Sequence, residues 1–157
     1  MPALDEVRAR MRADRFAAAC GVRLVAVRQG YARATLRLRP QHLNGVGVAQ
    51  GGAIFTLADL AFAAACNSHG TVAVALDVSI SYLRGLARGL LTAEAREVFL
   101  SRKVSVCEVK VTASDGALVA LFRGTAYRRE AAKAPGEPAR VARAAGRGRT
   151  GRPGAAP

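Results

Sequence analysis

The first forty residues change from a helical to an alternating pattern of hydrophobic positions at Gly21. Within residues 3–20, apolar side chains recur at helical spacing and arginines occupy the other side. The apolar positions are Leu4, Val7, Met11 and Phe16. This pattern predicts one amphipathic helix over 3–20. Residues 22–27 and 31–39 are predicted to form a hairpin, because the second segment alternates apolar and polar residues and Gln29-Gly30 supplies a turn.

A Gly-punctuated loop over 41–50 then leads into the most apolar run of the chain, AIFTLADLAFAAACNS. This run predicts a helix that ends near Asn67. Four strand candidates follow, at 72–83, 90–100, 103–113 and 117–128. Ser114-Asp115-Gly116 is a hairpin signal between the last two. Runs of strands after one long helix favour an α+β fold with an antiparallel sheet over a parallel βαβ fold.

Charge divides the 157 residues into two parts. Residues 131–157 hold six basic residues and one acidic residue, so +5 of the net charge of +13 lies in this tail. The tail is mostly Ala, Gly and Pro, and we expect it to be disordered. Residues 1–130 are expected to form one domain. Nucleic-acid binding is unlikely on this composition, because the chain has 5% aromatic residues, no Trp and no concentrated basic helix.

Three cysteines at unrelated spacings, Cys20, Cys66 and Cys107, are expected to be reduced thiols of a cytoplasmic protein. We expect no secretory signal, and the longest central apolar run, 60–66, is far below the roughly 20 residues that a membrane-spanning helix needs. Cys66-x2-His69 is a single pair and poor evidence for zinc, so no metal is predicted.

One charged residue, Asp59, lies between Pro40 and Leu76, in the middle of the apolar helix. A carboxylate there is costly unless it has a hydrogen-bond partner or a chemical task. Either it reaches solvent or a backbone group, or it belongs to a functional site. Gly51 and Gly52 stand at the start of the helix, where free N–H groups and the helix dipole attract developing negative charge.

An amide pair that can hold an oxyanion and an isolated carboxylate are two parts of an acyl-transfer site. At 1.5 Å rise per residue, Asp59 is about 12 Å from Gly51 along one helix. The two groups cannot obviously meet within one chain. A dimer that brings Asp59 of one chain to Gly51 of the other would unite them.

The segment HLNGVGVAQGGAIFTLADLAFAAACNSHG resembles the hotdog-fold acyl-CoA thioesterases of the phenylacetate-degradation (PaaI-like) family. The similarity continues through VSISYLRG, LLTAEARE and DGALVALFRGTAYR, and covers roughly residues 15–129. The resemblance implies a curved antiparallel sheet wrapped around a long central helix. It also implies a homodimer, usually paired into a homotetramer, with acyl-CoA hydrolysed at the dimer interface.

Carried over from the family, the catalytic carboxylate is Asp59, acting as nucleophile or as general base. The amide that polarises the thioester carbonyl is that of Gly51, beside Gly52, and the loop residue that contacts the carbonyl or water is Asn44. Gln50 stands where the family commonly has His, and it cannot titrate.

Substrate contacts are expected from a few further residues. Ser79 is a candidate for holding the attacking water, a position that Ser or Thr fills in some relatives. Candidates for the CoA phosphates are Arg84, Arg88, Arg102 and Lys103. No cofactor is expected, because coenzyme A is part of the substrate, and the acyl group is expected to be medium-chain or aryl. The alternative function, suggested by Gln50, is a non-catalytic acyl-CoA-binding protein.

Overall fold

The computed structural model describes residues 2–129, so the tail 131–157 and its predicted disorder lie outside the described residues. The helices are α1 (Pro2–Arg12), α2 (Arg15–Ala19) and α3 (Gly51–Cys66), with a short 3₁₀ helix η1 (Pro40–His42). The strands are β1 (Val22–Arg28), β2 (Tyr31–Arg37), β3 (Ala73–Tyr82), β4 (Leu90–Leu100), β5 (Val104–Ala113) and β6 (Leu118–Arg128). None of the described helices has the length and apolar character needed to cross a membrane.

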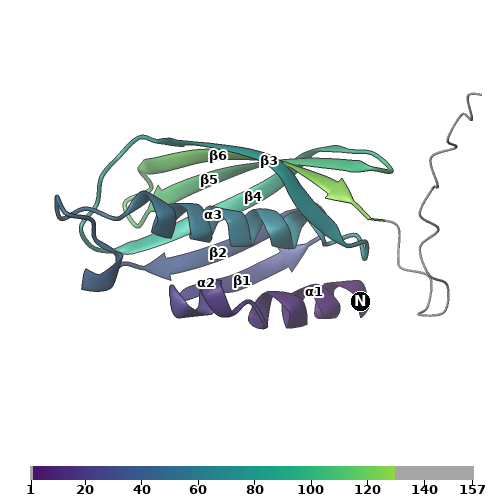
Figure 1. Cartoon of the computed structure of the whole chain (residues 1–157), viewed down its shortest axis with the longest axis horizontal. Coiled ribbons are helices and arrows are strands. Elements are labelled where there is room, and N and C mark those ends of the chain that lie inside the picture. Colours follow the sequence, from purple (N-terminus) through teal and green to yellow (C-terminus); the bar gives the residue numbers. More distant parts are fainter. Residues whose placement is uncertain (1, 130–157) are drawn as a thin grey trace, which may run out of the picture.

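All six strands form one antiparallel sheet in the order β1-β2-β4-β5-β6-β3, and α3 lies across one of its faces (Figure 1). Helices α1 and α2 run alongside β1 at one margin of the sheet (Figure 1). The α+β class and the curved antiparallel sheet around a central helix are confirmed. β1 and β3 are the two edge strands, and each pairs with one neighbour within the described chain.

The core is the contact between α3 and the inner face of the sheet. Ile54, Leu57, Leu60 and Phe62 of α3 are buried, and most of the other inner positions of the helix are alanines. Small side chains on both surfaces allow the helix to lie close to the strands. A stripe of less buried positions remains on the side of α3 that faces away from the sheet. It consists of Gly52, Thr56, Asp59 and Ala63.

The predicted single helix over 3–20 is wrong, because the structure divides it into α1 and α2. Asp14 ends the continuity: its backbone is extended, and its Oδ1 accepts a hydrogen bond from the Ala17 N–H at 2.9 Å. Asp is favoured at a helix N-cap, because its side chain accepts a hydrogen bond from a backbone N–H there. The same local hydrogen bonding disfavours Asp inside a helix. The break also turns Phe16 outward, where it is 71% exposed, whereas Val7 is in the core as predicted.

Gly124 of β6 marks the closest approach between the sheet and α3. A Cβ atom at this position would lie 2.7 Å from Phe62 Cε2 and 3.0 Å from Phe122 Cε1. The two rings are packed against each other, with centroids 5.5 Å apart. Only a residue without a side chain fits beneath them.

Gly124→Ala is therefore expected to lower the free energy of unfolding by about 1–3 kcal/mol, the usual cost of overpacking a core. Gly45→Ala is the matched control, because nothing lies within 4 Å of its Cβ position and its φ is not positive. Urea unfolding of both variants measures the difference. A Gly124→Ala protein as stable as the Gly45→Ala protein would contradict the packing described here.

Candidate active site

The loop that leads into α3 is organised by Asn44. Its Oδ1 accepts hydrogen bonds from the N–H groups of Val46 (3.0 Å) and Val48 (3.2 Å), and its own N–H donates to the Val48 carbonyl at 2.8 Å. Within the described residues the Asn44 side-chain amide NH₂ has no acceptor, and the residue is exposed. Asn44 thus shapes the loop with its oxygen and keeps two donors for another group.

The first residues of α3 have different hydrogen-bond states. Gln50 is the N-cap, and its side-chain oxygen accepts a hydrogen bond from the Gly52 N–H. The Gly51 N–H has no acceptor anywhere in residues 2–129. Because unsatisfied N–H groups and the helix dipole make this end of a helix electropositive, the Gly51 N–H is an available donor for a negatively charged oxygen.

The structure explains both glycines by close contacts. A Cβ at Gly52 would lie 2.7 Å from the Gln50 Oε1, so Gly52 leaves space for the cap. A Cβ at Gly51 would lie 3.1 Å from the ring of Tyr82. The Gly52 N–H donates to Gln50, so in the protomer it is not available to bind substrate. The predicted substrate-binding role of Gly52 stays a prediction.

Tyr82 is a member of the site that sequence reasoning missed. It ends β3, and its hydroxyl donates a hydrogen bond to the Gly51 carbonyl at 3.0 Å. Burial raises the pKa of Tyr82, so the hydroxyl remains protonated at neutral pH and keeps this bond. The sequence carries no signal that its ring covers the first residue of α3.

His42 is a second residue that sequence reasoning missed. Its ring is buried, and its Nδ1 accepts a hydrogen bond from the Arg39 N–H at 3.0 Å. Its carbonyl accepts a hydrogen bond from the Gln50 N–H at 2.7 Å, so η1 fixes the position of the helix cap. Because His42 belongs to no periodic pattern of apolar residues, its burial and its contact with the helix cap could not be predicted from the sequence.

Asp59 occupies the outward stripe of α3, about two turns after Gly51. Within the described residues its carboxylate has no hydrogen-bond or ion-pair partner. Burial raises the pKa of the Asp59 carboxyl, and the negative charge of nearby Asp14 raises it further. Asp59 therefore satisfies no backbone group within the described residues, and its position on the partly exposed stripe leaves it in contact with solvent. A partly buried, unpartnered carboxylate has the properties of a nucleophile or general base.

One protomer does not bring Asp59 and Gly51 together, since the helix separates them by about 12 Å. The strand next to this site, β3, is an edge strand of ten residues that pairs with β6 alone. Val74 and Leu76 on it are 47% and 63% exposed. A long edge strand with exposed apolar side chains is the kind of surface that another chain covers.

The remaining predicted contacts are dispersed. Val78 and Ile80 of β3 pack against the core, so Ser79 lies on the opposite face of the strand, away from α3. Arg84 forms an ion pair with Asp115 at 2.9 Å, and Arg88 is exposed in the loop before β4. The β4–β5 turn with Arg102 and Lys103 lies at the other end of the sheet. The roles of Ser79, Arg84 and Arg88 stay predictions.

A buried polar chain at the other end of α3 resembles a catalytic triad in composition only. Ser105 donates to Glu97 at 2.5 Å, and the second Glu97 oxygen bonds His69 at 2.7 Å. The carboxylate thus separates Ser from His, whereas a nucleophile needs the His beside it. Cys66 is buried 3.3 Å from the Cys107 sulfur, and no cluster of three metal-ligating side chains occurs within residues 2–129.

Comparisons with known proteins identify the family of this chain. Residues 46–120 match the model of the thioesterase superfamily. A relative from Archaeoglobus fulgidus is 45% identical over 107 residues, which are 68% of this chain and 70% of the relative. The acyl-coenzyme A thioesterase PaaI of Escherichia coli K12 is 39% identical over 116 residues, 73% of this chain and 83% of that protein.

Solved structures show the same relationship. The structure of E. coli PaaI superposes with a TM-score of 0.78 at 36% identity, covering 82% of this chain and 94% of that one. A Streptococcus pneumoniae hypothetical thioesterase, crystallised with coenzyme A, has a TM-score of 0.72 at 27% identity, with 77% and 95% covered. The fold and these similarities therefore define a hotdog-fold thioesterase. Within this class, the chain belongs to the PaaI-like family.

The raised pKa of Asp59 predicts how stability depends on pH. A carboxyl whose pKa is raised by folding stabilises the folded state at pH values below its unfolded pKa of about 3.9, and that contribution is lost as the pH rises through the folded pKa. The Asp59→Asn variant has no ionisable carboxyl at this position, so its stability does not fall in this way as the pH rises. We expect the variant to be more stable than the wild type at neutral pH, with the difference shrinking as the solution becomes acidic.

Thermal unfolding of both proteins between pH 4 and pH 8 measures this difference, because all other titrating groups are shared. Asp14→Asn is the matched control: Asn still caps α2, but the charge that raises the pKa of Asp59 is removed. The Asp14→Asn variant should therefore show part of the stability increase that is expected of Asp59→Asn at neutral pH. A pH-independent difference between wild type and Asp59→Asn would contradict the burial assigned to this carboxyl.

Proposed function

We propose that this enzyme hydrolyses acyl-CoA thioesters to a free acid and coenzyme A, with a medium-chain or aryl acyl group. The observation that carries the proposal is the pair of unsatisfied groups on α3, the Gly51 N–H and the Asp59 carboxylate. The E. coli relative named as an acyl-CoA thioesterase and the pneumococcal relative crystallised with coenzyme A support this choice of substrate.

In the proposed reaction, the thioester carbonyl oxygen accepts a hydrogen bond from the Gly51 N–H, which stabilises the charge that develops on it. The Asp59 carboxylate attacks the carbonyl carbon, or removes a proton from a water molecule that attacks it. The C–S bond breaks, and water supplies the hydroxyl of the acid and the proton of the thiol. Asn44 donates to the carbonyl or to the water. The route uses no cofactor and no metal.

Gln50 is compatible with this chemistry because the leaving group is a thiolate. Thiols have a pKa of about 8.5, so the departing sulfur needs much less help from a general acid than an alkoxide would. The Gln50 side chain is engaged in capping α3, which keeps the N–H of Gly52 occupied and that of Gly51 available. Its proposed role is to orient the amides.

The proposal includes a homodimer that pairs two β3 edges, and a dimer of dimers beyond it. Asp59 of one protomer would then face Gly51 of the partner subunit. The exposed apolar side chains on the β3 edge and the separation of the two groups within one protomer support this assembly. We place the reaction in the cytoplasm, in keeping with three cysteines that form no disulfide within residues 2–129.

A second candidate, a non-catalytic acyl-CoA-binding protein, is favoured by one observation, the non-titrating Gln50 at the helix cap. Hydrolysis assays over a panel of acyl-CoAs, with release of free thiol as the readout, separate the two. Turnover establishes the enzyme and identifies its acyl group. Saturable binding of acyl-CoA without thiol release would establish the binder.

Asp59→Asn is expected to fold and to dimerise, but to lose about 10²–10⁴-fold in turnover, because the change is nearly isosteric and removes only the ionisable group. Thiol release under saturating acyl-CoA measures the loss, and gel filtration checks the assembly. Near-wild-type turnover would remove Asp59 from the mechanism.

Mixed dimers test whether two protomers share a site. Gly51→Pro removes the N–H at the first position of α3, where Pro is tolerated, and Gln50 already has the extended backbone that Pro requires before it. Gly51→Ala is the control that keeps the N–H. When Asp59→Asn and Gly51→Pro chains are refolded together in equal amounts, about a quarter of wild-type activity should return, since half of the dimers would contain one intact site. No recovery would place both groups in one protomer.

Position 50 separates the enzyme from the binder by a second route. If Gln50 orients the amides, Gln50→Ala should cost activity without unfolding, and Gln50→His should change the rate little or raise it modestly. If the wild type is a binder, Gln50→His should create hydrolysis, since one positioned donor is worth about 10²–10³ in rate. Robust wild-type activity untouched by both changes would withdraw Gln50 from the site.

A further inference from the structure

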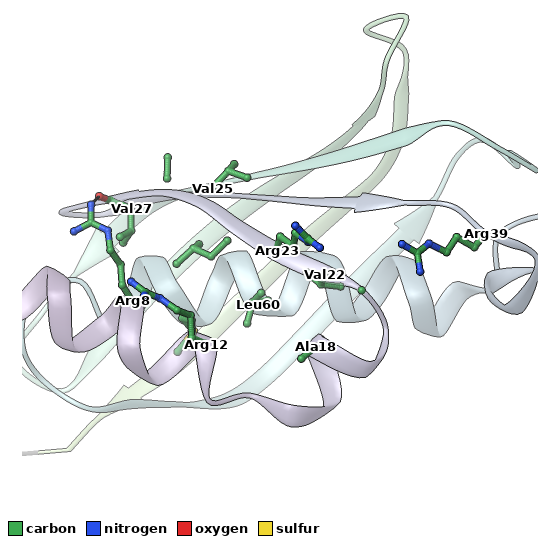
Figure 2. Close-up of a pocket in the computed structure, with 13 residues that line it drawn as sticks. Arg8, Arg12, Ala18, Val22, Arg23, Val25, Val27, Arg39 and Leu60 are labelled. Carbon is green, nitrogen blue, oxygen red and sulfur yellow. Dashed lines mark hydrogen bonds between the residues drawn. The ribbon is translucent and has the colours of Figure 1, made fainter.

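A groove of about 570 Å³ lies between β1 and the two N-terminal helices (Figure 2). One wall is formed by residues 21–27, along the edge of the sheet that pairs with β2 alone. The lining is mainly polar, and Met11, Val22 and Leu60 contribute apolar atoms to it. The volume is within the range of sites that hold small organic ligands. The residues assigned above to the reaction do not line it.

Arginines from three separate segments surround this groove. Figure 2 shows Arg8 and Arg12 on α1, Arg23 on β1 and Arg39 beyond β2, and no acidic side chain is among the lining residues. Arg8 is held by Asp5 at 3.1 Å and by the Val27 carbonyl at 3.4 Å. Arg12 and Arg23 have no hydrogen-bond or ion-pair partner in the described chain.

A second depression of about 260 Å³ adjoins the groove and shares Gly21, Arg23 and Arg39 with it. Arg37 is added there, so three arginines line one shallow surface, again without an acidic residue. Guanidinium groups pair with carboxylate and phosphate through two parallel hydrogen bonds. Several cations close together without counter-charges attract an anion to the space between them.

We propose that the groove and the adjoining depression form a binding site for an amphiphilic anion. The apolar chain of the ligand lies along the groove, over Met11 and Leu60, and its carboxylate or phosphate head pairs with Arg23, Arg37 and Arg39. A nucleic acid fits less well, because neither cavity presents an aromatic side chain for stacking. This site goes beyond the proposed hydrolysis, and ligand binding to it can be measured without turnover.

The test is titration calorimetry on the full chain with dodecanoate and dodecyl phosphate, each below its micellar concentration. Dodecanol lacks the charge, and inorganic phosphate lacks the chain. We expect at least one amphiphilic anion to bind at least tenfold more tightly than either control. The stronger of the two identifies the head group.

Variants locate the bound probe. Arg23→Ala and Arg39→Ala should each weaken binding about tenfold, the effect of losing a charge-assisted hydrogen bond. Arg33→Ala is the matched control, an exposed strand arginine outside both cavities, and should bind like the wild type. Ala18→Phe places a ring in the groove from the exposed side of α2 and should weaken binding of the amphiphile while all arginines remain.

The proposal is overturned if neither amphiphile binds, if dodecanol or inorganic phosphate binds equally well, or if Arg33→Ala has the same effect as Arg23→Ala. It is also overturned if Arg23→Ala raises the KM for acyl-CoA as much as it weakens probe binding, since these arginines would then belong to the substrate site. Thiol release by Arg23→Ala with its KM unchanged supports a separate site. Hydrolysis and probe binding therefore succeed or fail independently.

Discussion

Enclosure of α3 by the sheet is the constraint on which the rest of the structure depends. The helix is apolar on nearly all sides, and its alanines meet small side chains on the strands, so the two surfaces approach closely. Phe62 of α3 reaches Phe122 of β6 over Gly124, where no side chain fits. Among the places that this enclosure leaves for polar groups are the N-terminus of the helix and its outward stripe. Gly51 occupies the first place and Asp59 the second.

The enclosure also determines what the carboxylate costs. Asp59 is partly withdrawn from water and has no partner within residues 2–129, and Asp14 adds a like charge nearby. Each of these effects favours the protonated acid and so opposes the ionised form in the folded state. The proposed reaction offers a reason for this residue, because carboxylates with raised pKa values are better bases and nucleophiles. The stability cost and the proposed reaction therefore have the same physical origin.

Features that depend on local pattern could be predicted from the sequence, and features that depend on distant contacts could not. Alternation gave the strands, and the apolar run after Gly51 gave the central helix. The break at Asp14 was missed, because the sequence does not distinguish an Asp inside a helix from an Asp that caps the next helix. Tyr82 was missed, because its hydrogen bond to the Gly51 carbonyl joins residues 31 positions apart. The hydrogen bond from the Gly52 N–H to the Gln50 side chain could not be read from the sequence either, and the substrate-binding role of Gly52 stays a prediction.

The capping of α3 resolves which amide is available for an oxyanion. Two adjacent glycines look equivalent in the sequence, but Gln50 folds back onto the N–H of Gly52 and leaves that of Gly51 without an acceptor. The His42 carbonyl fixes the backbone of Gln50 from one side, and Tyr82 fixes the Gly51 carbonyl from the other. A donor held in this way needs no reorganisation when charge develops next to it, which is the condition under which electrostatic stabilisation is most effective. A side chain at position 50 that caps the helix is therefore sufficient to select the donor, and the ability to titrate is a separate property.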